Sequence, residues 1–272
     1  MFQNYIGYTY RGEHRIKARG EQPFADSVAR RKSYEARWKE TAPAEGCVKV
    51  KFLGHAGFQV VGSRVLFFDP FITGNRWCTT DLGAVRGADV VLVTHDHPHH
   101  VGDSFEICRR TGGTLVGITG LAEGEKGRGV RFQAMNLGGK IDLDGVVIHM
   151  VQSVHVGKTL PAAGYVVELD GCVLYHAGDT ALFEGLGQIG TDFEVDVACL
   201  PIGDRFGMGP REAARAVELI KPRFVVPMHY GTRPEIEQDP DEFRQLVAEH
   251  SEVRVLHPGE SLVLNARKVH RP

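Results

Sequence analysis

The sequence predicts an α+β protein in which two β-sheets pack together, with helices on their outer faces. Short apolar runs separated by tight turns dominate the chain from Val48 onward, as expected for adjacent strands. The second half alternates such runs with stretches of helical periodicity. Too many strands are neighbours in sequence for a doubly wound parallel sheet, so two packed sheets are the better layered solution.

The elements follow in order from these patterns. The first half is expected to hold strands at 48–53, 57–61, 64–69, 88–93, 131–137, 146–153, 164–169 and 173–176, with helices at 103–111 and 121–126. The second half is expected to hold strands at 195–201, 224–229, 253–256 and 261–264, with helices at 210–220 and 240–250. No low-complexity tract or linker divides residues 48–266, so residues 47–272 are expected to form one domain.

Residues 1–46 differ from the rest and are expected to form an N-terminal arm. Residues 1–40 carry a net charge of +4, whereas the remaining residues carry −6. A helix is expected over residues 24–39, and the segment Ala42-Pro43-Ala44-Glu45-Gly46 ends it. The arm is interpreted as a surface element packed on the domain, with a lid or a dimer contact as the alternatives.

Composition narrows the classes of partner. Hydrophobic residues make up 42% of the 272, which supports a sizeable core, and the net charge of −2 gives no reason to expect nucleic acid or a membrane surface as a partner. No apolar run approaches the length of a membrane span, and the first residues lack the apolar core of a secretory signal. Five scattered cysteines without a CxxC pair favour a reducing, cytoplasmic location. A small-molecule substrate and a possible homo-oligomer are expected; the oligomeric state itself cannot be read from the sequence.

A cluster of histidines follows the expected strand at 88–93. Four imidazoles fall within six residues, at His95, His97, His99 and His100. A strand that ends in such a cluster holds several imidazoles at one point on a rigid frame, and neutral imidazole is the commonest protein ligand for zinc and similar metals. The run therefore predicts a metal site.

Further candidate ligands follow later strands. His155, Asp179 and His229 each come at the carboxyl end of an apolar run, which places them along one rim of the sheets. A catalytic metal needs about three protein ligands and an open position, and two metals need roughly twice that number, often with a bridging carboxylate. The candidates are numerous enough for one or two divalent ions per chain, with zinc expected first and manganese, nickel or iron as alternatives.

Together these residues resemble the metallo-β-lactamase superfamily, whose motif His-x-His-x-Asp-His is followed by a His, an Asp and a His. Within it the chain resembles a branch of uncharacterised metal-dependent hydrolases and the related ascorbate-6-phosphate lactonase. The resemblance covers about residues 48–266 and not the N-terminal arm. Its matching segments are Leu53-Gly54-His55-Ala56-Gly57-Phe58, Phe68-Asp69-Pro70-Phe71, the histidine run, Tyr175-His176-Ala177-Gly178-Asp179-Thr180, Pro201-Ile202-Gly203-Asp204 with Met208-Gly209-Pro210, and Pro227-Met228-His229-Tyr230-Gly231-Thr232.

The resemblance implies a four-layer αββα sandwich and a binuclear metal site. It implies that His95, His97 and His155 hold the first metal. It implies that His100 and His229 hold the second, with Asp179 bridging the two.

The chain departs from the family at His99, where the superfamily carries Asp. Either His99 replaces that carboxylate as a ligand, or it swings out and the second site is weak or empty. Imidazole is neutral, so the exchange raises the charge of the site by one and favours borderline metals such as zinc over manganese or magnesium.

Six other polar residues are candidates for substrate contact or for holding a ligand in place. Asp69 is expected to orient a ligand histidine through its other ring nitrogen. His55 is expected either to contact substrate or to serve as a turn residue, and Tyr230 either to stabilise an oxyanion or to pack beside a ligand. The complete set is His55, Asp69, Asp96, His176, Asp204 and Tyr230.

The expected function is a metal-dependent hydrolase that uses metal-activated water on a small ester, lactone, amide or phosphodiester substrate, with Asp179 as the catalytic carboxylate. The lactone preference comes only from the resemblance. One alternative is a di-iron redox protein on the same fold, although such proteins carry Glu where this chain has His97. The other alternative is a non-catalytic metal-binding protein. The sequence does not identify the substrate or the metal.

Overall fold

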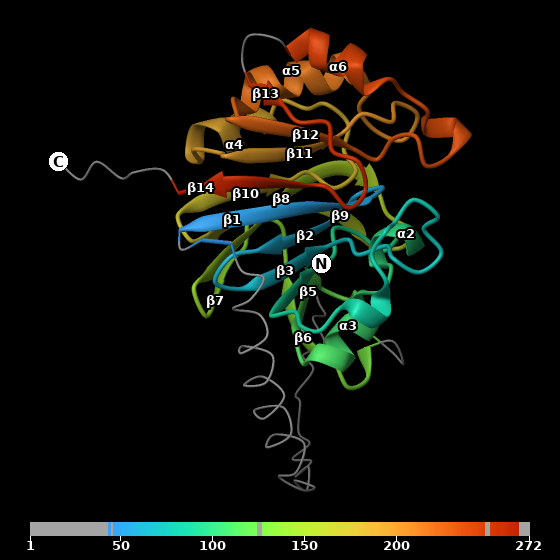
Figure 1. Ribbon diagram of the computed structural model, residues 1–272, viewed down its shortest axis with the longest axis vertical. Coiled ribbons are helices and arrows are strands. Elements are labelled where there is room, and N and C mark those ends of the chain that lie inside the picture. Colours follow the sequence, from blue (N-terminus) through green and yellow to red (C-terminus); the bar gives the residue numbers. More distant parts are fainter. Residues whose placement is uncertain (1–42, 45, 124–126, 248–250, 267–272) are drawn as a thin grey trace, which may run out of the picture.

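The computed structural model describes residues 43–44, 46–123, 127–247 and 251–266. Two seven-stranded sheets lie against each other, with helices outside them (Figure 1). The strands are β1 (Cys47–Gly54), β2 (Gly57–Val61), β3 (Val65–Phe68), β4 (Val90–Leu92), β5 (Thr114–Ile118), β6 (Arg131–Met135), β7 (Lys140–Leu143), β8 (Val146–Val156), β9 (Pro161–Leu169), β10 (Cys172–His176), β11 (Val197–Pro201), β12 (Phe224–Met228), β13 (Glu252–Val253) and β14 (Ser261–Asn265). The helices are η1 (Leu82–Ala84), α2 (Pro98–Val101), α3 (Ser104–Thr111), α4 (Leu186–Asp192), α5 (Pro210–Ile220), η3 (Pro234–Ile236) and α6 (Pro240–Val247).

The first sheet has the order β14-β1-β2-β3-β4-β5-β6. Strands β14, β1, β2 and β3 are antiparallel, whereas β3 to β6 are parallel. Strand β4 is buried at all three positions, as expected of a parallel strand covered on both faces. Because β3 and β4 run in the same direction, the residues that follow them, Asp69 and His95 among them, emerge at one edge.

The second sheet has the order β13-β12-β11-β10-β9-β8-β7. Strands β7 to β10 are antiparallel and β10 to β13 are parallel. Two hydrogen bonds join its strand β9 to the end of β4 in the other sheet: Tyr165 Oη donates to Val93 O at 2.8 Å, and Ala163 N donates to Thr94 O at 2.9 Å. The carboxyl ends of the two parallel groups therefore lie next to each other.

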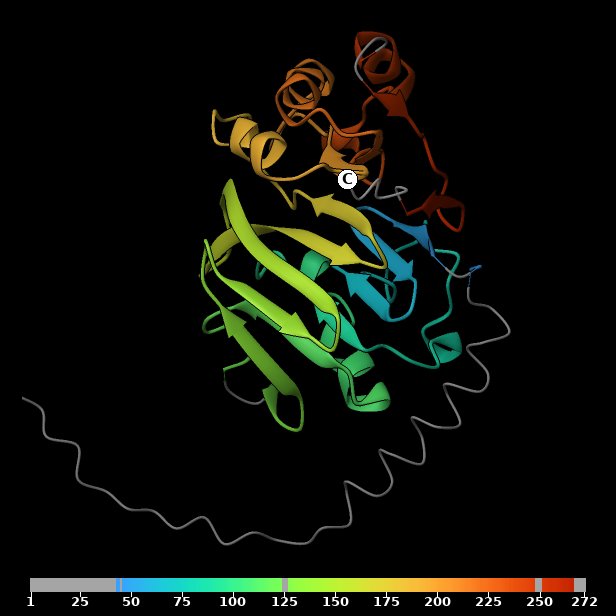
Figure 2. The same cartoon turned by 90° about the vertical axis from the view of Figure 1, so that its left-hand side faces the viewer.

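The helices cover the outer faces and complete the αββα layers. Helix α3 contacts β4 and β5 of the first sheet, while α4, α5 and α6 pack together beside the second sheet (Figures 1 and 2). A Cβ added at Gly190 in α4 would lie 2.4 Å from the carbonyl oxygen of Leu219 in α5, so only glycine permits this approach. Among the described residues, no helix is long and apolar enough to cross a membrane.

The predicted αββα sandwich is confirmed, and most predicted elements are present within a few residues. The helix predicted over 121–126 is wrong where the structure describes it, because residues 119–122 form a turn in which Gly120 has φ +97°. Neighbouring glycines disfavour a helix there. The sequence did not predict the strands β5 and β7, the helices α2 and α4, or the short helices η1 and η3. The predicted arm helix over 24–39 lies outside the described residues, so the two-part division at residue 46 stays a prediction.

Candidate metal centre

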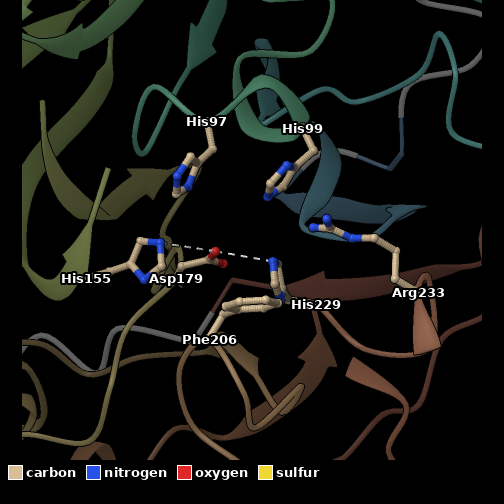
Figure 3. Close-up of a pocket in the computed structure, with 7 residues that line it drawn as sticks. All are labelled: His97, His99, His155, Asp179, Phe206, His229 and Arg233. Carbon is tan, nitrogen blue, oxygen red and sulfur yellow. Dashed lines mark ion pairs between the residues drawn. The ribbon is translucent and has the colours of Figure 1, made fainter. Parts of the chain in front are cut away.

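The candidate site lies where the parallel strands of both sheets end. His95, His97, His99 and His100 occupy the loop and short helix after β4, and His155 comes from the end of β8. Asp179 follows β10 and His229 follows β12. Figure 3 shows the imidazoles of His97, His99, His155 and His229 around Asp179. The structure thus brings all seven predicted metal ligands together; their role as ligands stays a prediction.

His95, His97 and His155 form one cluster of possible metal ligands, whose nitrogens lie within 4.8 Å of one another. Nε2 of His95 lies 2.9 Å from Nδ1 of His97. The other ring nitrogen of His95 lies 3.0 Å from the hydroxyl of Thr94, which already donates to Asp69. Nδ1 of His95 is therefore the donor in this pair, which leaves the lone pair of Nε2 directed at the cluster.

Asp179 sits between this cluster and the next. Its Oδ2 lies 3.2 Å from His229 Nε2, 3.3 Å from His100 Nε2 and 3.7 Å from His155 Nε2. Burial alone would raise the pKa of Asp179, but the imidazoles of His100 and His229 hold it well below its usual range. The carboxylate is therefore ionised and placed where it can face two cations.

Backbone conformation brings Asp179 this close. Gly178 has φ +61°, and a Cβ on it would lie 2.9 Å from both Thr94 Cβ and Ala163 O. A side chain at this position would thus push the Asp179 segment away from the end of β4. The neighbouring His176 bonds backbone at both ring nitrogens, Ala56 O at 2.9 Å and Gly178 N at 3.2 Å, so it braces the segment from behind.

Asp69 contacts His100 and fixes the orientation of its ring. Asp69 Oδ2 accepts from His100 Nδ1 at 2.7 Å and from Thr94 Oγ1 at 2.6 Å, and its Oδ1 accepts from Thr94 N at 2.8 Å. This bond fixes the proton of His100 on Nδ1 and leaves Nε2 for the cluster. Burial alone would lower the pKa of His100, but the carboxylates of Asp179 and Asp69 raise it to about 10. Without a cation, His100 is therefore protonated between two carboxylates.

His55, His99, His100 and His229 form the second cluster, again with ligand nitrogens within 4.8 Å of one another. The ring centroids of His55 and His229 are 4.2 Å apart, and His229 N donates to His55 O at 2.7 Å. Both residues have positive φ, +59° and +55°, a costly conformation for side-chain-bearing residues that tends to occur at functional sites. The structure thus puts His55 beside the predicted second metal position, with Nδ1 2.7 Å from Thr232 Oγ1.

The donor set fits divalent cations. Buried polar atoms normally have a hydrogen-bond partner, because an unpaired one loses its interaction with water. Seven buried side-chain atoms of the described residues have no hydrogen-bond partner; two are the hydroxyls of Ser104 and Tyr175, and the other five belong to the two clusters or to the carboxylate between them. These five are Nε2 of His55, His100, His155 and His229, and Oδ1 of Asp179. Lone pairs converging from neutral imidazoles and a carboxylate are the ligands that zinc and its neighbours prefer.

Three predicted residues lie apart from the clusters. Asp96 accepts from Lys158 N at 2.6 Å and from Thr159 N at 2.7 Å, so it ties the histidine loop to the β8–β9 connection. Asp204 lies in an exposed turn after β11. Tyr230 is half-buried against the core. Burial raises the pKa of its hydroxyl, and the nearby carboxylate of Asp241 raises it further. None of the three lines the pocket described next, so their proposed roles at the substrate stay predictions.

A pocket of about 200 Å³ opens over the clusters. Besides Asp179 and four of the histidines, Phe206 and Arg233 line it, and neither was a candidate in the sequence (Figure 3). Thr94 and Thr232, which bond the site histidines, were missed as well. Thr94 directly precedes the histidine run, and Thr232 and Arg233 follow the predicted ligand His229 by three and four positions, so adjacency could have found all three. Phe206 carries no such signal, because only the fold brings its loop to the site.

Comparison with known proteins places this geometry in a family. The β-lactamase superfamily domain matches residues 49–229. This chain belongs to the β-lactamase superfamily. A UPF0173 metal-dependent hydrolase from Thermococcus kodakarensis is 47% identical over 225 residues, which cover 80% of this chain and 100% of the relative. The chain therefore also belongs to the UPF0173 metal-dependent hydrolases, and the resemblance read from its motifs is confirmed.

Solved structures agree on the fold of this UPF0173 member. Igni18, a metallo hydrolase from Ignicoccus hospitalis, matches with a TM-score of 0.76 and 36% identity, covering 80% of this chain and 99% of that one. CmlA, a diiron β-hydroxylase from Streptomyces venezuelae, matches with a TM-score of 0.64 over 82% of this chain and 55% of that one. At 15% identity, the likeness to CmlA shows the fold alone.

Proposed function

We propose that this chain is a hydrolase that uses metal-activated water on a small ester, lactone, amide or phosphodiester substrate. One observation supports this above the others: a buried, ionised carboxylate, Asp179, stands between two groups of imidazoles, and four of these imidazoles have a buried Nε2 without a hydrogen-bond partner among the described residues. Such a donor set fits two cations that share one carboxylate. A pocket of about 200 Å³ leaves room for a small substrate or for the reacting end of a larger one.

Each cation has its own set of side chains in this proposal. His95, His97 and His155 would hold the first ion, and His99, His100 and His229 the second, with Asp179 shared. His55 is a further possible ligand for the second ion, because its free Nε2 belongs to that cluster. Zinc is the expected metal, since imidazoles outnumber carboxylates in both sets. When bound, the ions lower the pKa of a water toward neutrality and polarise the bond to be broken.

The chain's own residues orient and exchange protons. Asp179 Oδ1 has no partner in the described structure and is buried, so it accepts the hydrogen bond of the attacking water and takes its proton. Asp69 keeps the proton of His100 on Nδ1, away from the reacting groups. Phe206 covers part of the pocket with apolar surface and so limits the entry of bulk water.

The test combines metal analysis with activity. Protein stripped with a chelator is reloaded with zinc, manganese, nickel or iron, and metal content is measured beside turnover of ester, lactone, amide and phosphodiester substrates. We expect one or two ions per chain and turnover of at least one substrate class. Asp179→Asn should lower turnover by about 10²- to 10⁴-fold with the fold intact. His149→Ala is the matched control, because His149 bonds Glu168 outside both clusters.

The alternatives give other outcomes. A di-iron redox protein would bind iron with visible absorbance and consume oxygen without hydrolysing any substrate of the panel. A non-catalytic protein would bind metal with no turnover, and full activity in Asp179→Asn would remove the proposed role of that carboxylate. The first cluster contains only imidazoles, which favours hydrolysis over the redox alternative.

The proposed enzyme acts in the cytoplasm on a small molecule. All five cysteines are free, in accord with a reducing compartment. Neither a nucleic acid nor a membrane is part of the proposal.

A further inference from the structure

Arg233 gives the pocket a cation that the proposed metal sites do not use. It lies on the side of the pocket formed by His99 and His229, across from His155 (Figure 3). Asp179 is the one carboxylate among the residues that line the pocket, and it faces the imidazoles. The guanidinium therefore stands at the edge of the metal centre.

The backbone of Arg233 is fixed by contacts on both sides. On its carboxyl side, Ile236 is fully buried and its N–H donates to Arg233 O at 3.1 Å. On its amino side, the hydroxyl of Thr232 bonds His55, and Gly231 N donates to Ile236 O at 2.8 Å. A side chain on such a loop loses less freedom when it binds a ligand than one on an unanchored loop.

No carboxylate of the described residues forms an ion pair with Arg233. Other exposed arginines do have such partners: Arg244 lies 3.0 Å from Asp241, for example. The positive charge of Arg233 therefore remains available to a ligand in the pocket.

With two metal ions bound, the net charge of the site would also favour an anionic ligand. Asp179 is the one carboxylate among the possible metal ligands of the two clusters, so two divalent ions would share it alone. Two such ions add four positive charges, and Arg233 adds a fifth, against one negative charge lining the pocket. A small cleft with this excess concentrates anions and discriminates against cations.

We propose that Arg233 binds a carboxylate or phosphate group of the substrate, so that this protein is selective for small anionic esters or lactones. A guanidinium binds both groups through two parallel hydrogen bonds. The anionic group lies away from the bond to be hydrolysed, and Phe206, 43% exposed, contacts the apolar part between them. This inference rests on the proposed hydrolase function, and its test separates the two.

Three p-nitrophenyl esters of similar size probe the anion preference: the neutral butyrate, the succinate monoester and the ester of phosphonopropanoic acid. They are assayed with zinc-loaded wild type, Arg233→Met and Arg233→Lys. Arg64→Met is the matched control, since Arg64 lies in the β2–β3 turn at the opposite end of those strands from His55. Zinc content is measured for every variant.

We expect wild type to prefer the anionic esters. Arg233→Met should lower kcat/KM for them by about 10- to 100-fold, the range for a hydrogen bond to a charged group, and change the neutral ester by less than about 3-fold. Arg233→Lys should recover part of the loss, and Arg64→Met should match wild type. The ester with the larger loss identifies carboxylate or phosphate as the natural group.

An equal effect of Arg233→Met on all three esters, or no effect on any, overturns the inference while leaving hydrolysis intact. If no ester is hydrolysed, calorimetric titration of succinate and inorganic phosphate into the same zinc-loaded proteins still decides it. Binding at least about 10-fold weaker in Arg233→Met supports the anion site although the proposed activity has failed. Equal binding in wild type and variant overturns the anion site as well.

Discussion

Replacing His99 by alanine tests how the second metal site is built. His99 comes from the short helix α2, and its ring centroid lies 4.8 Å from those of both His55 and His100. No hydrogen bond to the described residues holds its ring, so packing alone places it in the cluster. If its nitrogen binds the second ion, the variant keeps three imidazoles and the shared Asp179.

The size of the effect follows from this ligand set. Structural zinc sites bind with about 10–16 kcal/mol from about four ligands, or about 3 kcal/mol per ligand, which is about 100-fold in affinity. His55 has a nitrogen in the same cluster, and binding of this nitrogen to the ion would offset part of the lost affinity. The second ion should therefore bind between about 10- and 100-fold more weakly in His99→Ala, and the first ion as in wild type.

The assay is competition between metal-stripped protein and a chromophoric chelator, which resolves the two binding constants. His149→Ala is the control for loss of an imidazole outside the clusters. His99→Asp should restore the family pattern and raise affinity for manganese relative to zinc, because a carboxylate returns to the site. Identical stoichiometry and affinity in wild type and His99→Ala would show that His99 is not a ligand and refute this reasoning.

Four further outcomes are expected. Asp69→Asn should weaken metal binding by about 10- to 100-fold in the same competition, because His100 loses the carboxylate that orients it; unchanged affinity would contradict this. The free energy of unfolding of metal-free protein, from denaturant titrations, should be highest near pH 6.5. The pKa of His100 is raised to about 10 by Asp179 and Asp69 despite burial. Protonated His100 therefore stabilises the folded state, and this stabilisation is lost as pH rises from 6.5 to about 10. The pKa of His99 is lowered to about 3, mainly by burial, so the folded state loses stability as pH falls from 6.5 toward 3; constant stability above pH 6.5 would oppose the assignment to His100, and constant stability below it the assignment to His99. Gly190→Ala should cost about 1–3 kcal/mol in urea unfolding, because the new Cβ meets the α5 backbone, while metal affinity stays that of wild type. Deleting residues 1–40 should change stability or the mass in solution, measured by light scattering, more than the saturated rate; the opposite result would favour a lid.

Most strands along the chain and the types of the candidate ligands could be predicted from the sequence, because both depend on local patterns. An apolar run such as 88–93 followed by His95 and His97 marks a buried strand with ligands at its end, whatever the rest of the chain does. The same pattern places Asp179 and His229 at strand ends, and parallel strands in one sheet end together. The fold class and the candidate ligands were therefore predicted from the spacing of these residues along the chain and from the family resemblance of the same motifs.

Elements without a strong local pattern were decided by packing. Helix α4 has the sequence LGQIGTD, whose two glycines disfavour a helix, yet its packing on α5 and the burial of Leu186 and Ile189 in the core stabilise it. Strand β5 is short, apolar and preceded by Gly112 and Gly113, so periodicity does not distinguish it from a buried helical turn.

The tertiary structure determines which distant residues meet at the site. His55 and His229 lie 174 positions apart, and their rings meet only because the β1–β2 turn and the end of β12 reach the same edge. Phe206 likewise lines the pocket because its loop after β11 reaches this edge. A local pattern fixes which residues face the core, since strand and helix periods are short. It carries no information about which distant loops share an edge, because that depends on how the two sheets pack over the whole chain.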